Sequence, residues 1–216
     1  MTPEGPPGPL AGLTVLVPRA SGQAGGFSAL LRERGAEALE VPAIEIRPVA
    51  STAELDRAVQ ELAGDRYDWL VLTSVNGVAA LRARVEALRP AARRGPPGRA
   101  RVAVVGPATE AAVRDWGAVP DLVPEAATTE ALSLVFPNGP GDVLLARADR
   151  ANPELGAALR AKGWRTREVV AYHTVPVGEL DPDARRRLDA GEVDWVAFTA
   201  ASTVEGFVRG YGGPPP

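Results

Sequence analysis

An internal repeat constrains the fold of this 216-residue chain more than any other feature of the sequence. Four pairs of segments share nearly one spacing: VLVPRA (15–20) with VLLARA (143–148), Gly35 with Gly163, VPAIEIRPV (41–49) with VVAYHTVPV (169–177), and DWLVLT (68–73) with DWVAFT (194–199). The first three pairs lie 128 positions apart and the fourth 126. Because repeats at a fixed period indicate copies of one structural unit, the sequence predicts an internal duplication.

The second copy is shorter than the first. The first copy continues through residues 101–136, and the counterpart of this segment would begin about a dozen positions beyond Pro216. We therefore expect the second copy to be incomplete, either because the natural protein is short here or because residues are missing from the sequence.

Hydrophobic periodicity indicates an α/β fold. Five short apolar runs are continuous rather than alternating, as is typical of strands buried on both faces of a parallel sheet. These runs are 14–17, 69–72, 102–105, 143–145 and 195–198. Helix-start signals lie between them: a capping box at Ser51–Glu54, and a cap followed by an N1 proline at Asn152-Pro153 and at Asp181-Pro182. The alternation predicts two doubly wound parallel-sheet domains.

Two segments that end in Pro-Val or Val-Pro, 41–50 and 169–177, are predicted to be linker strands. If they pair with each other, they join the two domains as a two-stranded linker. The first domain then combines residues 1–40 and 178–216, and the second contains residues 51–168. The alternative is that each segment is simply the second strand of its own α/β unit.

Composition excludes several kinds of chemistry. The chain has no cysteine and a single histidine, His173, which excludes thiol catalysis, iron–sulfur clusters and zinc sites of the Cys/His type. His173 has no nucleophile-elbow motif near it, so we interpret it as a polar strand residue. The net charge of −3 argues against nucleic acid or a membrane surface as a partner, and no apolar run is long enough to span a bilayer. We expect no metal site and a cytoplasmic location.

Residues 82–101 contain seven arginines but also several prolines and glycines. No aromatic residues lie between the arginines to stack on bases. We interpret this stretch as a solvated loop rather than a nucleic-acid surface.

Five turns that follow predicted strands carry hydroxyl, amide or arginine side chains, and each turn opens a helix. Their candidate substrate-binding residues are Arg19, Thr73, Ser74, Asn76, Thr109, Arg147, Thr199 and Ser202. Ligands of open α/β sheets bind at the carboxyl ends of the strands, and the unpaired N–H groups of helix starts attract anions. Lining one cleft together, the turns would suit a ligand with many carboxylates. The alternative is that each turn is an ordinary helix cap.

Blocks along most of the chain resemble the uroporphyrinogen-III synthase family. They are VLVPRA, DWLVLTSVNGVAAL, VAVVGPATEAAV, VVAYHTVPV and DWVAFTAAST, in the family's order, from about residue 12 to 208. The resemblance implies a cofactor-free hydro-lyase of tetrapyrrole and haem biosynthesis. Such an enzyme removes water from linear hydroxymethylbilane, inverts the last pyrrole ring and closes uroporphyrinogen III. It also implies two α/β domains joined by a two-stranded ladder, with the active site in the cleft between them.

The family's pattern can be carried onto individual residues of this chain. Its tyrosine in the second connecting strand falls on Tyr172, its threonine after the glycine turn on Thr109, and its Thr-Ser pair on Thr73 and Ser74. We predict Tyr172 to be the catalytic residue, a phenol that donates a proton or hydrogen bond to the departing hydroxyl. The alternative role for Tyr172 is structural support of the hinge.

Two departures from the family favour a rival interpretation. Ala200 stands where the family often has serine, and the second copy lacks a counterpart of VVGPAT. A non-catalytic regulatory module that binds a tetrapyrrole or another polyanion in the same cleft would show these features. As an enzyme, the chain is expected to be a monomer that acts on hydroxymethylbilane, with possible handover from porphobilinogen deaminase.

Overall fold

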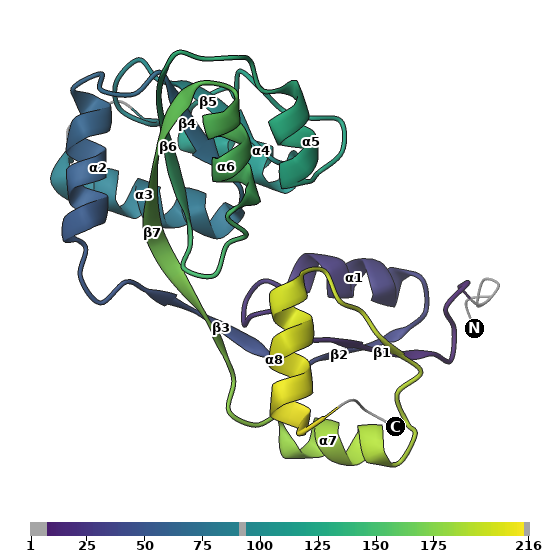
Figure 1. The fold of residues 1–216 in the computed structure, drawn as a ribbon. Helices are drawn as coiled ribbons and strands as arrows, with labels where there is room; N and C mark the ends of the chain where they lie inside the picture. Colours follow the sequence, from purple (N-terminus) through teal and green to yellow (C-terminus); the bar gives the residue numbers. More distant parts are fainter. Residues whose placement is uncertain (1–7, 91–93, 214–216) are drawn as a thin grey trace. The chain divides into compact units, whose positions relative to one another are not determined.

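The computed structural model describes residues 8–90 and 94–213, and the chain divides into two compact units. Unit 1 contains the chain up to Ile46 and from Thr174 onward, and unit 2 runs from Arg47 to His173. The division cuts through both predicted linker segments, 41–50 and 169–177. Figure 1 labels the helices and strands.

Unit 1 is built on a parallel sheet with the strand order β2-β1-β8. Its elements are β1 (Thr14–Val17), α1 (Gly25–Glu33), β2 (Glu37–Glu40), α7 (Pro182–Asp189), β8 (Trp195–Val196) and α8 (Ala201–Tyr211). Leu16 of β1, Leu188 of α7 and Phe207 of α8 meet in its core. As predicted, Asp181 caps α7: its carboxylate accepts hydrogen bonds from the N–H groups of Asp183 and Ala184, at 3.0 and 3.1 Å.

The second sheet has the strand order β3-β7-β6-β4-β5, and the pairs β7–β6, β6–β4 and β4–β5 are parallel. Its strands are β3 (Ile44–Pro48), β4 (Trp69–Leu72), β5 (Arg101–Val104), β6 (Gly141–Ala148) and β7 (Trp164–Pro176). The helices of unit 2 are α2 (Ala53–Ala63), α3 (Val75–Leu88), α4 (Pro107–Trp116), α5 (Thr129–Val135) and α6 (Glu154–Ala161). This arrangement confirms the α/β fold with parallel sheets.

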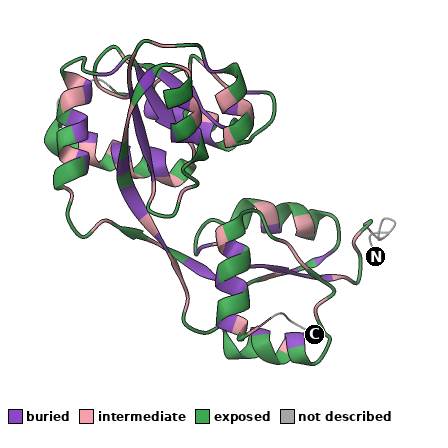
Figure 2. Cartoon of the chain, in the orientation of Figure 1, coloured by how far each residue is buried: buried purple, intermediate pink, exposed green. Residues whose placement is uncertain are grey.

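One core cluster of unit 2 lies on the side of the sheet covered by α5 and α6, and it contains three aromatic side chains, Trp69, Phe136 and Trp164. The ring centroids of Trp69 and Phe136 are 4.9 Å apart, and those of Phe136 and Trp164 are 5.8 Å apart. The central strands β4 and β6 are buried along most of their length (Figure 2). The continuous apolar runs at 69–72 and 143–145 therefore lie in central strands, which helices cover on both faces of the sheet.

Several local predictions need correction. The capping box at Ser51–Glu54 does not form: Thr52 is the N-cap of α2 and makes no cap bond, and its hydroxyl donates to Asp56 at 2.8 Å. The arginine-rich stretch is not a loop throughout, since α3 continues to Leu88. Arg84 lies within α3 and its Nε donates to Asp56 at 2.6 Å. Residues 91–93 of that stretch lie outside the described residues.

The Asn152-Pro153 signal is displaced by one residue. Pro153 is the N-cap of α6 rather than its first helical residue. The Asn152 side chain still accepts a hydrogen bond from the N–H of Glu154, at 3.0 Å. Among the described residues of the chain, no helix combines the length and the apolar character that a membrane span requires.

The two sheets share one feature at the strands that begin with Trp and are preceded by Asp, β4 and β8. In unit 2, Asp68 Oδ2 accepts a hydrogen bond from the N–H of Asp142, at 2.8 Å. In unit 1, Asp194 Oδ2 accepts one from the N–H of Thr14, at 2.7 Å. Thr14 and Asp142 are themselves 128 positions apart. The equivalent aspartate, Asp68 in unit 2 and Asp194 in unit 1, therefore fixes the start of the neighbouring strand in each unit.

Candidate active site

A bulge in β7 decides which way Tyr172 points. The register between β6 and β7 is regular as far as Arg147, which lies opposite Val170. It then shifts by one residue: Ala171 has no partner, and Ala148 lies opposite Tyr172. A bulge breaks the alternation of side chains along a strand and re-aims the side chains that follow it. The alternation of side chains along β7 is reversed from this point.

Regular alternation would have turned Tyr172 away from α3. Before the bulge, Glu168 contacts α6 and Arg167 contacts α2, so even-numbered and odd-numbered side chains lie on opposite faces. Without the bulge, even-numbered Tyr172 would share the α6 face with Glu168. With the bulge it faces the start of α3, which packs beside α2.

Tyr172 and Ser74 form the central contact of the candidate site. The phenol Oη lies 2.9 Å from Ser74 Oγ, although the two residues are 98 positions apart. Ser74 is the N-cap of α3, and its Oγ accepts a hydrogen bond from the N–H of Gly77 at 3.0 Å. Because a hydroxyl has one hydrogen to donate, Ser74 can donate to Tyr172 Oη and leave the phenolic hydrogen available. Tyr172 as a whole is 93% covered, so it is held in place rather than exposed to bulk water.

Gly77 keeps this cap close to the sheet. A Cβ at this position would lie 2.9 Å from the carbonyl oxygen of Ala146 on β6. Such a distance is shorter than real Cβ contacts, so any side chain here would push the start of α3 away from β6. The glycine therefore sets the depth at which Ser74 meets Tyr172.

Three further predicted residues lie at the same edge of the unit 2 sheet. Thr73 directly follows β4, Asn76 lies in the first turn of α3, and Thr109 lies in the first turn of α4 after β5. Because β6, β4 and β5 are parallel neighbours, their carboxyl ends share one edge. Thr73 and Asn76 are half-buried and Thr109 is buried. The structure thus gathers Thr73, Ser74, Asn76, Thr109 and Tyr172 in one unit.

The placement of Arg147 in a turn is wrong. β6 continues to Ala148, so Arg147 belongs to the strand, where it is 95% covered. Its guanidinium lies 3.3 Å from the carboxylate of Glu168 on β7 and donates to the backbone carbonyl of Asn152. A buried guanidinium is stable only with such partners. These contacts hold the segment after β6 against β7.

The remaining predicted residues belong to unit 1. Arg19 follows β1 and is half-buried, Thr199 follows β8 and is exposed, and Ser202 lies half-buried in the first turn of α8. Since β1 and β8 are parallel neighbours, the three residues lie at one edge of the unit 1 sheet. The predicted turns therefore form one group in each unit.

Sequence reasoning missed one pair beside the candidate site. His173 Nδ1 lies 2.9 Å from Asp149 Oδ2, which joins β7 to the residue that follows β6. The backbone N–H of Asp149 also donates to the carbonyl oxygen of Tyr172, at 3.2 Å. A lone histidine in an apolar strand gave no signal of this partner, which lies 24 positions earlier.

Other polar clusters lie away from these residues. Burial, followed by the hydrogen bond to Glu61, raises the pKa of Tyr67 to about 12.

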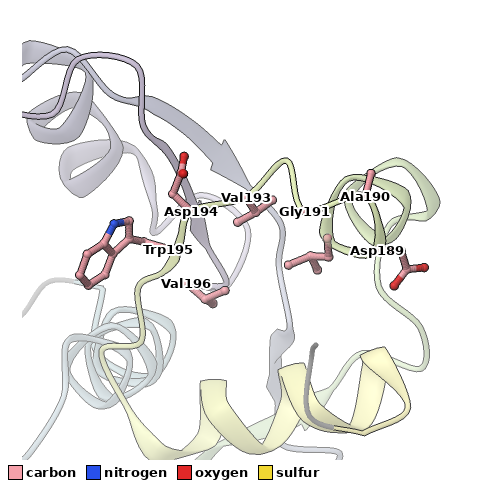
Figure 3. A pocket seen from close by; sticks show the side chains of 8 residues that line it. Asp189, Ala190, Gly191, Val193, Asp194, Trp195 and Val196 are labelled. Carbon is pink, nitrogen blue, oxygen red and sulfur yellow. The ribbon is translucent and has the colours of Figure 1, made fainter.

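A pocket of about 550 Å³ in unit 1 lies between the end of α7 and β8, and it is lined by Asp189, Asp194 and Trp195 among others (Figure 3). It contains none of the predicted site residues. Within the described part of the chain, no three His, Asp or Glu side chains form a group suited to a metal ion.

Comparisons with known proteins agree with one another. A family model described as uroporphyrinogen-III synthase HemD matches residues 26–214. Uroporphyrinogen-III synthase of Synechococcus elongatus is 33% identical over 204 residues, which cover 93% of this chain and 75% of that protein. Porphyrin biosynthesis protein HemD of Ruminiclostridium josui is 30% identical over 212 residues, and the match spans 93% of this chain but only 40% of that protein.

Solved structures show the same likeness. A crystal structure of a mutant uroporphyrinogen III synthase from the extremely thermophilic bacterium Thermus thermophilus matches this chain with a TM-score of 0.67 and 27% sequence identity. The match covers 92% of this chain and 77% of that one.

Proposed function

The chain belongs to the uroporphyrinogen-III synthase family, and we propose that Tyr172, held by Ser74, is the group that assists the loss of water from hydroxymethylbilane. The family's reaction closes this linear tetrapyrrole, with inversion of its last ring, to give uroporphyrinogen III. The observation that carries the proposal is the 2.9 Å contact between Tyr172 Oη and Ser74 Oγ at the carboxyl edge of the unit 2 sheet.

Tyr172 acts on the hydroxyl group that leaves the substrate. With Ser74 donating to Tyr172 Oη, the phenolic hydrogen points to the leaving hydroxyl and stabilises it as the carbon–oxygen bond breaks. The departing hydroxyl takes up one proton and leaves as water, and the ring carbon that attacks the resulting cation loses one proton as its ring regains aromaticity, so no net proton is consumed. Hydrogen-bond or proton donation of this kind contributes about 10²- to 10⁴-fold to a rate.

Orientation of the flexible substrate supplies the rest of the rate enhancement in this proposal. Four pyrrole rings must fold so that the correct carbon of the last ring reaches the cationic carbon, and holding reactants in such a geometry is worth several kcal/mol. Thr73, Asn76 and Thr109 supply polar groups at the edge where Tyr172 lies, and the starts of α3 and α4 add backbone N–H groups for carboxylates.

The two arginines of the repeat differ in this proposal. Arg147 is committed to Glu168 and to the carbonyl of Asn152, so its role is to fix the carboxyl end of β6. Arg19, Thr199 and Ser202 are proposed to bind substrate carboxylates from unit 1. Arg19→Ala is therefore expected to weaken substrate binding only modestly, because backbone N–H groups and hydroxyls share the load.

The internal duplication and the assembly are also part of the proposal. The matched contacts of Asp68 and Asp194 support two copies of one α/β unit, and the left-handed backbone of Gly35 (φ 94°) and Gly163 (φ 93°) supports the same conclusion. We propose that the protein is a cytoplasmic monomer. We also propose that it receives its substrate directly from porphobilinogen deaminase, because free hydroxymethylbilane closes spontaneously to the type I isomer.

Steady-state kinetics of Tyr172→Phe test the proposed role. Porphobilinogen deaminase generates hydroxymethylbilane, and the oxidised products are separated into type I and type III uroporphyrin. Tyr172→Phe is expected to lower kcat for type III formation about 100-fold or more with little change in KM.

Tyr67→Phe is the matched control, because it removes another largely buried phenol that bonds a polar partner in the same unit, at 2.6 Å. It should leave kcat within about twofold of the wild-type value. A folded Tyr172→Phe protein with wild-type kcat would remove Tyr172 from the chemistry.

A further inference from the structure

We propose that His173 and Asp149 are a positioning pair that keeps Tyr172 aimed at Ser74. The pair takes no direct part in the chemistry. The inference rests on the role given to Tyr172 in the proposed function, and it assigns a task to the only histidine of the chain.

The orientation of Tyr172 depends on one irregularity in β7. Tyr172 faces Ser74 only because β7 bulges at Ala171, and a bulge leaves one residue without a ladder partner. Moving the pairing by one residue would turn Tyr172 to the opposite face of the sheet. Something must therefore hold the register immediately after the bulge.

Asp149 supplies two contacts at that point. Its backbone N–H donates to the carbonyl oxygen of Tyr172 at 3.2 Å, and its carboxylate lies 2.9 Å from Nδ1 of His173. One residue is thereby joined to two consecutive residues of β7, directly after Ala171. Both contacts would be lost if β7 slid by one position against β6, so together they favour the bulged register.

The imidazole and the phenol have different surroundings. His173 lines a hollow of about 390 Å³ whose lining also includes Ser51, Glu54 and Glu168. Tyr172, by contrast, meets Ser74 at the start of α3. The ring therefore acts on the reaction through the backbone of β7, which makes it a positioning residue rather than a catalytic one.

A second cross-strand pair provides the natural control. At the opposite end of the same two strands, Arg165 Nε donates to Asp142 Oδ1 at 2.9 Å. Arg165 opposes Asp142 in the regular part of the ladder, far along β7 from the bulge. The control pair joins Asp142 of β6 to β7, and the proposed pair joins Asp149, the residue after β6, to β7. Only the His173–Asp149 pair lies beside Tyr172.

The test measures kcat and KM for type III formation in matched variants. His173→Ala and Asp149→Ala should each lower kcat about three- to tenfold, the loss that follows from one hydrogen bond, with KM nearly unchanged. His173→Asn should restore most of kcat, because the Asn side-chain amide presents an N–H donor close to the position of Nδ1. Arg165→Ala should leave kcat within about twofold of wild type.

A double-mutant cycle separates positioning from any independent role. In the Tyr172→Phe background, His173→Ala should cause no further loss, because there is no phenolic hydrogen left to aim. An equal loss in both backgrounds would show that the imidazole acts independently of Tyr172 and would overturn the inference. Wild-type kcat in His173→Ala, with Tyr172→Phe impaired, would also overturn it.

The proposed function fails in a different way. If Tyr172→Phe itself keeps wild-type kcat, the role of Tyr172 is refuted whatever the His173 variants do. Circular dichroism and thermal unfolding confirm that each variant is folded. If His173→Ala does not fold, His173→Leu, which keeps the volume but has no donor, is measured in its place with the same expected loss.

Discussion

Two strands of the molecule begin with the same Asp-Trp pair, yet their surroundings differ. In unit 2, Trp69 opens β4, which lies between β6 and β5, and its side chain is 5% exposed. In unit 1, Trp195 opens β8, which lies at the edge of the described sheet, and its side chain is 64% exposed. The same local pattern therefore gives a core strand or a surface strand, depending on how many strands flank it.

The turns that follow these strands differ in the same direction. Ser74 and Ala200 have almost the same backbone angles, with φ/ψ of −155°/153° and −158°/150°. Only Ser74 makes a side-chain cap bond, and only Ser74 has a hydroxyl to place against Tyr172. The two turns therefore share their backbone geometry. Only the turn of unit 2 has the side-chain hydroxyl, that of Ser74, which the proposed chemistry uses.

The largest expected difference in unfolding free energy is between alanine variants of the two tryptophans. Trp69→Ala should lower the free energy of unfolding by about 3–5 kcal/mol, because the cavity would open beside Phe136 in the core of unit 2. Trp195→Ala should change it by less than about 0.5 kcal/mol. Urea unfolding of both variants measures the contrast, and equal losses would show that Trp195 is as well covered as Trp69.

The two arginines of the repeat provide the next contrast. Arg147→Ala should cost about 2 kcal/mol of unfolding free energy, because it removes a buried guanidinium and leaves Glu168 and the Asn152 carbonyl without that partner. Arg19→Ala, in the half-buried counterpart, should cost less than about 0.5 kcal/mol. Urea unfolding of both variants measures the two changes in unfolding free energy, provided that the dependence on urea concentration is the same as in the wild type. A larger loss of stability in Arg19→Ala than in Arg147→Ala would contradict the proposed roles.

Exchanging the two cap residues sharpens the comparison of the turns. Ser74→Ala should destabilise the protein by about 1 kcal/mol, because α3 loses its cap bond to the Gly77 N–H. Ala200→Ser should stabilise it by up to about 1 kcal/mol, since its backbone already has the angles of a capping residue. Thermal unfolding of both variants measures the two signs. A destabilising Ala200→Ser would mean that the two turns differ in more than the hydroxyl.

The smallest expected effects are electrostatic. The hydrogen bond from Arg84 holds the pKa of Asp56 below its usual value of 3.8, so this pair stabilises the fold above about pH 4 and loses that contribution as the pH falls further. Arg84→Gln should therefore lower stability at pH 7, by about 1 kcal/mol or less, and its effect should shrink as the pH falls below about 4. Arg187 likewise lowers the pKa of exposed Glu37 in unit 1.

The same measurement on Arg187→Gln compares the units. We expect a smaller change than for Arg84→Gln, because Glu37 is exposed and water and salt screen its charge from Arg187. A pH-independent difference between Arg84→Gln and wild type would show that Asp56 does not titrate with this partner. Urea unfolding at several pH values gives both results.

Much of the fold could be predicted from the sequence because burial on both faces leaves a continuous apolar run. The strands at 14–17 and 69–72 have the predicted bounds for this reason. The end of β6 could not be predicted in the same way. Arg147 interrupts the apolar run, and its place inside the strand depends on Glu168, a partner 21 positions further along the chain.

The candidate site shows the same limit. Tyr172 could be named only from its resemblance to a family tyrosine, because the bulge at Ala171 that aims it arises from pairing with β6. Its partner Ser74 looked like an ordinary cap, which it also is. The contact between the two residues joins positions 98 apart, a distance at which local patterns carry no information.

The isomer composition of the product tests the central claim most directly. The 216-residue chain is added to a mixture in which porphobilinogen deaminase generates hydroxymethylbilane, and type I and type III uroporphyrin are separated after oxidation. Spontaneous closure gives type I. We predict that type III predominates when the chain is present. Type I alone, in the presence of protein shown to be folded, would contradict a catalytic role for the Tyr172–Ser74 site.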